Sequence, residues 1–196
     1  YNPSGIVLFE GSNYNLVLNN SVYKSEHYGI QLTDASNNTI VKNQVWRNGG
    51  GGIGLYNASD DNKIEENNAS YNLFNGIDLD NCRKNVVREN RADYNEWGGI
   101  GLYFGCEENA VEDNEVGYNT WAGITLGECD GNVVTGNNAT RNALGGIKLQ
   151  GSHDNLLIHN DLVENAMEGA AIRITSPLVE SLLESAGDLR DERAKN

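Results

Sequence analysis

Two aspartates flanked by tyrosines are the residues of this sequence whose types and spacing best suit chemistry. Asp78 and Asp80 are two positions apart, and Tyr56 and Tyr103 lie about one repeat before and after Asp80. Residues two apart on a β-strand point to the same face, about 7 Å from each other. Carboxylates accept hydrogen bonds from sugar hydroxyls, and aromatic rings offer flat apolar surface to sugar rings. We therefore expect these four side chains to bind carbohydrate, on a shallow floor left bare by glycines on either side of Asp78.

The same two carboxylates also suit catalysis. A separation of about 7 Å fits the acid and base of an inverting glycosidase. However, nothing in the sequence predicts that either aspartate is buried enough to stay protonated. Lys148 lies three repeats away, about 14 Å from Asp78, which is too far to complete a lyase site. We favour a non-enzymatic domain, with a hydrolase, lyase or epimerase that uses Asp78 and Asp80 as the alternative, and a purely structural repeat as the third hypothesis.

These positions belong to a Gly-Ile-x-Leu motif that returns every 23 or 24 residues. Its seven copies begin at Gly5, Gly29, Gly52, Gly76, Gly99, Gly123 and Gly146, and a degenerate eighth copy lies at 171–174. So regular a period indicates a stacked architecture in which each unit buries its apolar face against its neighbours. The Ile and Leu of each copy should point inward, and the residues after them outward.

Three asparagines, five residues apart, follow nearly every copy of the motif. The middle column is Asn20, Asn43, Asn67, Asn90, Asn114, Asn137 and Asn160. One apolar residue lies between successive asparagines, which indicates short strands joined by asparagine corners. A stacked amide can both donate and accept hydrogen bonds, as in the asparagine ladders of cross-β assemblies. We predict an all-β, single-stranded parallel β-helix of about eight coils, spaced about 4.8 Å apart.

The end of the chain departs from this pattern. Ser176 and Pro177 are typical of a helix N-cap and first turn, and apolar residues follow at helical spacing, at Val179, Leu182, Leu183 and Ala186. We therefore expect a β-helix over 1–176, a short amphipathic capping helix over 177–187 that covers the last coil, and a charged tail over 188–196.

Composition limits the partners. The formal net charge of -14 and the pI near 4.5 disfavour nucleic acid, and also acidic glycans unless a divalent cation bridges them. No apolar run is long enough to cross a bilayer, so no membrane insertion is expected. The chain begins at Tyr1 without a Met, which we interpret as a mature protein or an excised domain with further domains upstream.

The sequence predicts no cofactor or metal site. The three cysteines share one column of the repeat, Cys82, Cys106 and Cys129, and are expected to form an inward ladder of small residues. The histidines are scattered, and Met167 is the single methionine, so there is no cluster of soft ligands for copper. Carboxylates crowd the variable turn at Asp60, Asp61, Glu107, Glu108, Glu128 and Asp130. They indicate either a solvated acidic rim or, as an alternative, calcium.

Two further aromatic columns could be packing or a rival binding surface. One precedes the motif and contains Phe74, Trp97, Trp121, Leu144 and Met167, and the other contains Tyr71, Tyr94 and Tyr118. Apolar rows on successive coils are usually packed. If they are exposed, they mark an extended interaction surface.

Gly-Ile-x-Leu followed by Asn-x-Val-x-x-Asn-x-x-x-x-Asn, repeated over about residues 5–174, resembles the parallel β-helix repeats (PbH1) of the NosD-like, carbohydrate-binding and sugar-hydrolase (CASH) superfamily. The resemblance implies a right-handed coil and a carbohydrate partner, but not a particular reaction. The Gly-His-Gly motif of polygalacturonases and the Asp-Pro-His motif of epimerases are absent. We therefore expect an extracellular, cell-surface or periplasmic domain that binds carbohydrate or a cell-surface polymer, or serves as a rigid adhesion module.

Overall fold

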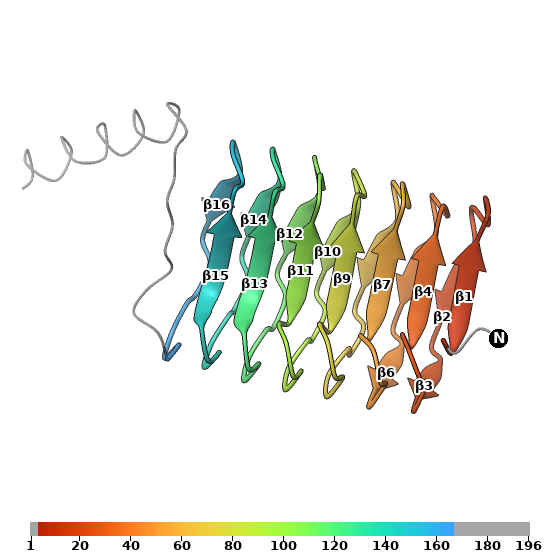
Figure 1. The fold of residues 1–196 in the computed structure, drawn as a ribbon, viewed down its shortest axis with the longest axis horizontal. Helices are drawn as coiled ribbons and strands as arrows, with labels where there is room; N and C mark the ends of the chain where they lie inside the picture. The colour runs from red at the N-terminus through yellow and green to blue at the C-terminus, as the bar shows by residue number, and fades with distance from the viewer. Residues whose placement is uncertain (1–3, 167–196) are drawn as a thin grey trace, which may run out of the picture.

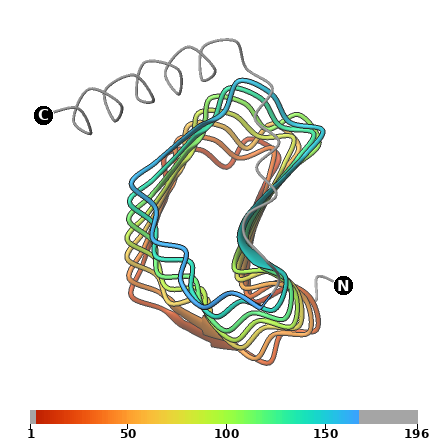
Figure 2. The ribbon, with the colours of Figure 1, turned by 90° about the vertical axis from the view of Figure 1, so that its left-hand side faces the viewer.

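The computed structural model describes residues 4–166 as an all-β solenoid of about seven turns. The described residues form sixteen strands and no helix. Figure 1 shows the strands in rows, and Figure 2, along the long axis, shows the coils superposed around a common interior. The predicted parallel β-helix is confirmed. The predicted capping helix at 177–187, the tail at 188–196 and the eighth copy at 171–174 lie outside the described residues.

The motif strands form one seven-stranded parallel sheet. In spatial order they are β1 (Ile6–Phe9), β4 (Ile30–Thr33), β7 (Ile53–Tyr56), β9 (Ile77–Asp80), β11 (Ile100–Tyr103), β13 (Ala122–Gly127) and β15 (Gly145–Gln150). Equivalent residues pair directly, as Ile53 does with Ile77 and Ile77 with Ile100. This register places every motif position in a straight column.

Two further sheets complete the wall. The second has seven strands, β2 (Leu16–Leu18), β5 (Thr39–Val41), β8 (Lys63–Glu65), β10 (Val86–Arg88), β12 (Ala110–Glu112), β14 (Val133–Thr135) and β16 (Leu156–Ile158). The third pairs β3 (Ser21–Tyr23) with β6 (Gln44–Trp46), and isolated parallel bridges continue it along the axis. The described residues contain no helix that could cross a membrane.

The core consists of stacked layers, one for each coil, with similar apolar side chains in each layer. The Ile and Leu of the central motif copies are fully buried, as Ile77 and Leu79 are. The three cysteines are buried and unbridged in their own column, so the inward ladder of small residues is confirmed. Because each layer touches only the layers above and below, the core extends along the whole rod.

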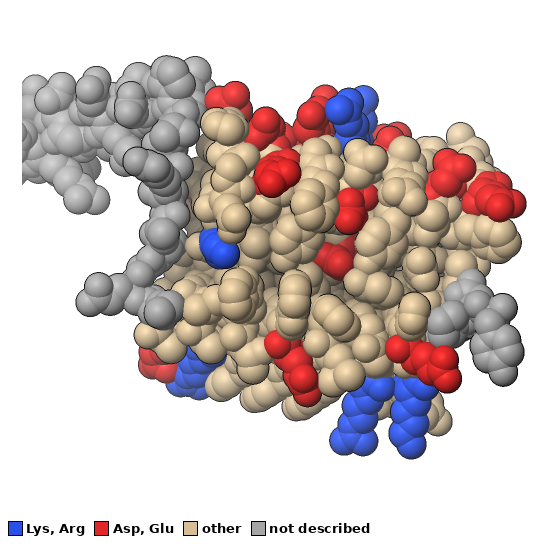
Figure 3. Space-filling view, in the orientation of Figure 1, with Lys and Arg blue, Asp and Glu red and all other residues tan. Residues whose placement is uncertain are grey.

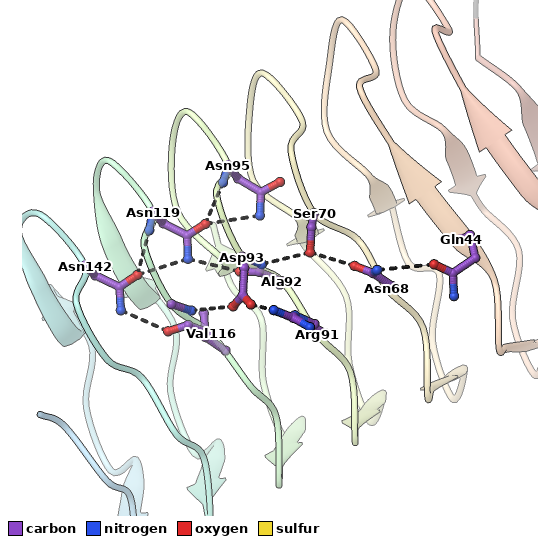
Figure 4. A network of polar contacts seen from close by, with 11 residues as sticks. Gln44, Asn68, Ser70, Arg91, Ala92, Asp93, Asn95, Val116, Asn119 and Asn142 are labelled. Carbon is purple, nitrogen blue, oxygen red and sulfur yellow. Dashed lines mark hydrogen bonds and ion pairs between the residues drawn. The ribbon is translucent and has the colours of Figure 1, made fainter.

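Asparagine ladders hold the corners. Asn90, which is 1% exposed, donates to Asn114 Oδ1 at 3.1 Å and to the carbonyl of Ile64 at 2.7 Å, and its own Oδ1 accepts from the backbone and amide nitrogens of Asn67. Figure 4 shows the next corner, where Asn95, Asn119 and Asn142 bond in the same way beside the buried Asp93, which pairs with the exposed Arg91. Each amide thus links three successive coils and satisfies buried backbone groups.

The variable turn after the motif alternates between two forms over the first six coils, and the seventh coil repeats the short form. In coils of 24 residues, two consecutive residues have a left-handed backbone: Glu10 and Gly11, Asn57 and Ala58, Phe104 and Gly105. In the coils between them only one does, as at Asp34 and Asn81. The added residue donates its N–H to the next, shorter turn, as Ala58 does to the carbonyl of Asn81 at 2.9 Å. Long and short turns therefore stack as pairs.

Candidate functional site

The structure brings the four predicted site residues together. Asp78 and Asp80 lie on β9, the middle strand of the motif sheet, and Tyr56 and Tyr103 pair with Asp80 from β7 and β11. Figure 2 shows that this sheet curves inward, and Figure 3 shows acidic side chains near the middle of its outer face. The position of each residue within the repeat therefore predicted correctly that these four residues lie together.

The expectation of a bare floor beside Asp78 is wrong. A Cβ on Gly54 would lie 2.8 Å from the ring of Tyr56, and a Cβ on Gly101 would lie 2.4 Å from the ring of Tyr103. Each tyrosine therefore folds back over the glycine two residues before it, where no side chain stands in the way. Gly54 and Gly101 leave room for the rings of Tyr56 and Tyr103, and these rings cover the surface beside Asp78.

The carboxylate of Asp78 is enclosed by hydrogen-bond donors. Its Oδ2 accepts from the hydroxyls of Tyr28 at 3.0 Å and Tyr56 at 3.2 Å, and its Oδ1 accepts from the amide of Asn75 at 3.0 Å. Burial raises the pKa of Asp78 to about 6, although these three hydrogen bonds act in the opposite direction. Asp78 is therefore a protonatable group close to neutral pH.

Tyr28 and Asn75 were missed by the sequence analysis. Both immediately precede the glycine of their motif copy, in a column that was not considered because it lies before the strand begins. Burial, with the nearby Asp78 carboxylate as a further cause, raises the pKa of both Tyr28 and Tyr56 above the ordinary tyrosine value. Both hydroxyls therefore remain donors to Asp78.

A groove of about 470 Å³ opens next to this cluster, over β11, β13 and β15. Tyr103 forms part of its wall, whereas Tyr56, Asp78 and Asp80 lie outside its lining on the neighbouring strands. The groove forms because Gly127 pairs with Tyr103 in the sheet register, so the surface falls from a ring to bare backbone between β11 and β13.

An unsatisfied hydroxyl lies at the bottom of the groove. Thr125 lines the groove and is 5% exposed. Burial raises the pKa of Tyr103 and the neighbouring Thr125 hydroxyl lowers it, so the Tyr103 hydroxyl is the nearest candidate partner of Thr125. That contact does not meet the geometry of a hydrogen bond, and Thr125 Oγ1 therefore makes no well-formed hydrogen bond within residues 4–166. A buried polar atom without a partner is unfavourable, which indicates a position that a ligand hydroxyl or water would satisfy.

Exposed aromatic side chains wall the groove. Trp97 is 52% and Trp121 44% exposed, with ring centroids 6.5 Å apart, and Phe104 stands on the opposite side. The sequence left open whether the tryptophan column is packed or exposed, and the structure places it at the surface. The ammonium of Lys148 lies 5.1 Å from the centre of the Trp121 ring, at cation–π distance.

The tyrosine column offers no comparable surface. Tyr71, Tyr94 and Tyr118 stack face to face with centroids 4.9 and 4.8 Å apart, and the Arg141 guanidinium lies 5.5 Å from the Tyr118 centroid. Although each tyrosine is partly exposed, the faces of the rings are occupied by one another and by Arg141. This column therefore reinforces a corner and leaves little aromatic face for a ligand.

Two family models match the chain. The model of the right handed beta helix region matches residues 1–72, and that of the periplasmic copper-binding protein NosD matches residues 66–177. The chain is therefore a right-handed parallel β-helix protein, as its repeat predicted. It belongs to the NosD family.

Solved structures show the same fold. The mannuronan C-5 epimerase AlgE4 A-module of Azotobacter vinelandii is 15% identical with a TM-score of 0.72, over 89% of this chain and 57% of that one. The periplasmic alginate epimerase AlgG is 21% identical with a TM-score of 0.65, over 84% and 48%. The chain thus spans about half the length of these neighbours, whose likeness at such identity concerns the fold. No curated protein matches the sequence.

Copper, which the family description names, does not fit the described side chains. Within residues 4–166, no group of three or more His, Cys, Asp or Glu residues is placed so that it could hold a metal ion. The thiols of Cys82 and Cys129 donate to backbone carbonyls at 3.1 and 3.2 Å. Burial raises the pKa of Cys82 to about 12, which keeps it a thiol, whereas copper binds the thiolate.

The acidic side chains of the variable turns bind N–H groups and an arginine of the neighbouring turn. Asp60 accepts the N–H of Arg83 at 2.7 Å, Glu107 pairs with the Arg83 guanidinium at 3.0 Å, and Asp130 accepts the N–H of His153 at 2.6 Å. These carboxylates link successive turns along the rod, which favours the acidic rim over the calcium alternative.

Proposed function

We propose that this chain is the carbohydrate-binding β-helix domain of an exported protein, periplasmic or extracellular, and that its binding site is the groove over β11, β13 and β15. The observation that carries the proposal is the combination of exposed tryptophans with a buried Thr125 hydroxyl that lacks a partner. The names of the structural neighbours, which are epimerases of alginate and mannuronan, and the periplasmic location in the names of NosD and AlgG, support both parts.

The groove supplies the two kinds of contact that sugars need. Trp97 and Trp121 stack on each other and Lys148 lies over the Trp121 ring, so a sugar ring would contact the exposed edges and the remaining exposed ring surface. Thr125 and Gln150 offer neutral hydrogen-bonding groups in the same groove. Tyr103 joins the groove to the Asp78 cluster. A longer chain would therefore continue over β9 and β7, where Asp80 and Tyr56 provide the next contacts, as the sequence first suggested.

Replacing Trp121 by alanine tests the proposal. A stacking aromatic at the centre of a site contributes enough to change affinity about tenfold or more, so Trp121→Ala should weaken glycan binding by at least that factor in calorimetry, using ligands found on a glycan array. The matched control is Tyr94→Ala, which removes a similarly exposed aromatic outside the groove. Binding that survives Trp121→Ala, or no binding to any glycan, would overturn the proposal.

A catalytic role is the second candidate, and one observation favours it. Asp78 is enclosed, has a pKa raised to about 6 and is bonded by two tyrosine hydroxyls, which suits a general acid or base. A hydrolase would release new reducing ends, and a lyase would release unsaturated products. An epimerase would release neither, but would invert a carbon of the sugar within the polymer. The test is incubation with a panel of polysaccharides, assay of both kinds of cleavage product, and proton NMR of the recovered polymer for the inverted sugar. Turnover that disappears in Asp78→Asn while glycan binding persists would establish the enzyme, and absence of product across the panel would reject it.

A further inference from the structure

Among residues 4–166, the charges that line the groove are mostly negative. Glu96 and Glu128 stand in its lining, and Lys148 is the single cation among these described lining residues. The Lys148 ammonium is already placed against the Trp121 ring. An anionic ligand would therefore meet two carboxylates and one cation that has a competing partner.

Acidic residues outside the groove add to its negative electrostatic potential. Asp80 lies on β9, two strands from the centre of the groove, and the Asp78 carboxylate lies beside it on the same strand. Figure 3 shows acidic side chains near the middle of the face, with most basic side chains at its upper and lower margins. The whole chain carries a formal charge of -14. A low-dielectric groove focuses such a field on its contents.

The uncharged polar groups in the groove are suited to hydrogen bonds with the hydroxyls of a ligand. The Thr125 hydroxyl and the Gln150 amide both donate and accept, whereas a carboxylate accepts only. No guanidinium lies in the lining to hold a carboxylate in the two-pronged geometry that arginine provides. The polar contacts are therefore those of a ligand that presents alcohols.

From this arrangement we propose that the groove selects uncharged glycans and discriminates against polyuronates. The inference rests on the proposed function and specifies its ligand class. It also separates this chain from its structural neighbours, whose names give alginate and mannuronan as their polymers, because such polymers carry one carboxylate on every sugar. An uncharged chain stacks on Trp97 and Trp121 without placing anions against Glu96 and Glu128.

Calorimetry with matched oligosaccharides tests the selectivity. The probes are neutral gluco-, manno-, xylo- and galacto-oligosaccharides, oligomannuronate, oligogalacturonate and a free-amine glucosamine oligomer, all of equal length. We expect at least tenfold tighter binding of the best neutral oligosaccharide than of either uronate. Its affinity should also change less than twofold between about 0.02 and about 0.5 M salt, because salt screens charge but not stacking.

A charge variant sharpens the result. In Glu96→Gln with Glu128→Gln, uronate binding should strengthen several-fold at low salt, so that the ratio of neutral to uronate affinity falls by the same factor or more. Thermal unfolding of the variant checks that it is folded. Uronate or glucosamine-oligomer binding that exceeds neutral binding would overturn the selectivity yet leave the groove as a glycan site. Absence of all binding, or neutral binding that Trp121→Ala does not weaken, would overturn the proposed function itself.

Discussion

At the scale of single residues, the enclosure of Asp78 determines how the stability of the fold depends on pH. The pKa of Asp78 is about 6 in the folded chain against an ordinary value of 3.8. A carboxyl whose pKa is raised by folding favours the folded state when it is protonated. This contribution is fully present below about pH 3.8 and is lost as the pH rises through 6.

Asp78→Asn should therefore stabilise the protein at neutral pH. The amide keeps an acceptor for Tyr28 or Tyr56 and removes the enclosed charge, so we expect a gain of about 1 to 3 kcal/mol at pH 7.5 that shrinks towards pH 4. Urea unfolding at a series of pH values measures the difference. The control is Asp34→Asn, an exposed aspartate, which should show no such trend. An equal effect of Asp78→Asn at pH 4 and pH 7.5 would contradict the assignment.

At the scale of elements, the asparagine corners carry buried polar groups that only their own column can satisfy. Asn90→Ala leaves the Asn67 donors and the carbonyl of Ile64 without their partner, so we expect a loss of about 1 to 3 kcal/mol in unfolding free energy. Asn90→Asp should be worse at neutral pH, because it removes donors and buries a charge. Asn15→Ala, in the exposed first coil, is the control and should have a much smaller effect. Equal losses at both positions would refute the ladder as the source of stability.

The paired turns give a second test at this scale. Ala58 has a φ of 57° at the position where Gly11 and Gly105 stand in the other long turns. A left-handed backbone costs a residue with a Cβ about 1 to 2 kcal/mol, partly offset by the flexibility of glycine when unfolded. Ala58→Gly should therefore raise the unfolding free energy by about 0.5 to 1 kcal/mol.

The reverse change supplies the control. Gly11→Ala has no atom within 4 Å of the added Cβ, so its effect isolates the backbone, and it should destabilise by a similar amount. If both substitutions shift the urea midpoint in the same direction, the left-handed position does not determine the effect.

The extent to which the sequence predicts this molecule also differs between elements and residues. The repeat predicts which residues lie in the same column. It therefore also predicts the parallel sheet, the buried cysteines and the proximity of Asp78, Asp80, Tyr56 and Tyr103. It does not set the orientation of rings. Whether Tyr56 leaves or covers Gly54, and whether Trp121 packs or is exposed, depends on contacts between coils that a period cannot encode. Thr125 escaped notice for the same reason, whereas Tyr28 lies in the column before the strand, which was not considered.

At the scale of the whole molecule, each coil packs mainly on its neighbours, with the Tyr28–Asp78 hydrogen bond as a contact across two coils, so complete coils should be removable. Deleting residues 30–76 joins Gly29 to Ile77 and preserves both the register and the alternation of turns. We expect a folded rod with a lower melting temperature, because stability is roughly a sum over coils and their interfaces. Glycan binding in the groove, whose residues all lie beyond the deletion, should persist.

Circular dichroism and calorimetry measure both outcomes. The control deletion of residues 30–64 removes one coil and part of another, which puts the remaining strands out of register and should abolish cooperative unfolding. If the two deletions behave alike, the coils do not act as independent modules.

The alternation of long and short turns also bears on ancestry. Over the first six coils it doubles the period, and the segments at 51–56 and 98–103 both read Gly-Gly-Ile-Gly-Leu-Tyr. Tandem duplication of a two-coil segment would leave such a doubled period, and Tyr56 and Tyr103 would then descend from one ancestral residue. The segment at 145–150 stands at the same place two coils later but reads Gly-Gly-Ile-Lys-Leu-Gln and is followed by a short turn, so it has lost both the tyrosine and the longer turn, and the groove lies open beside it.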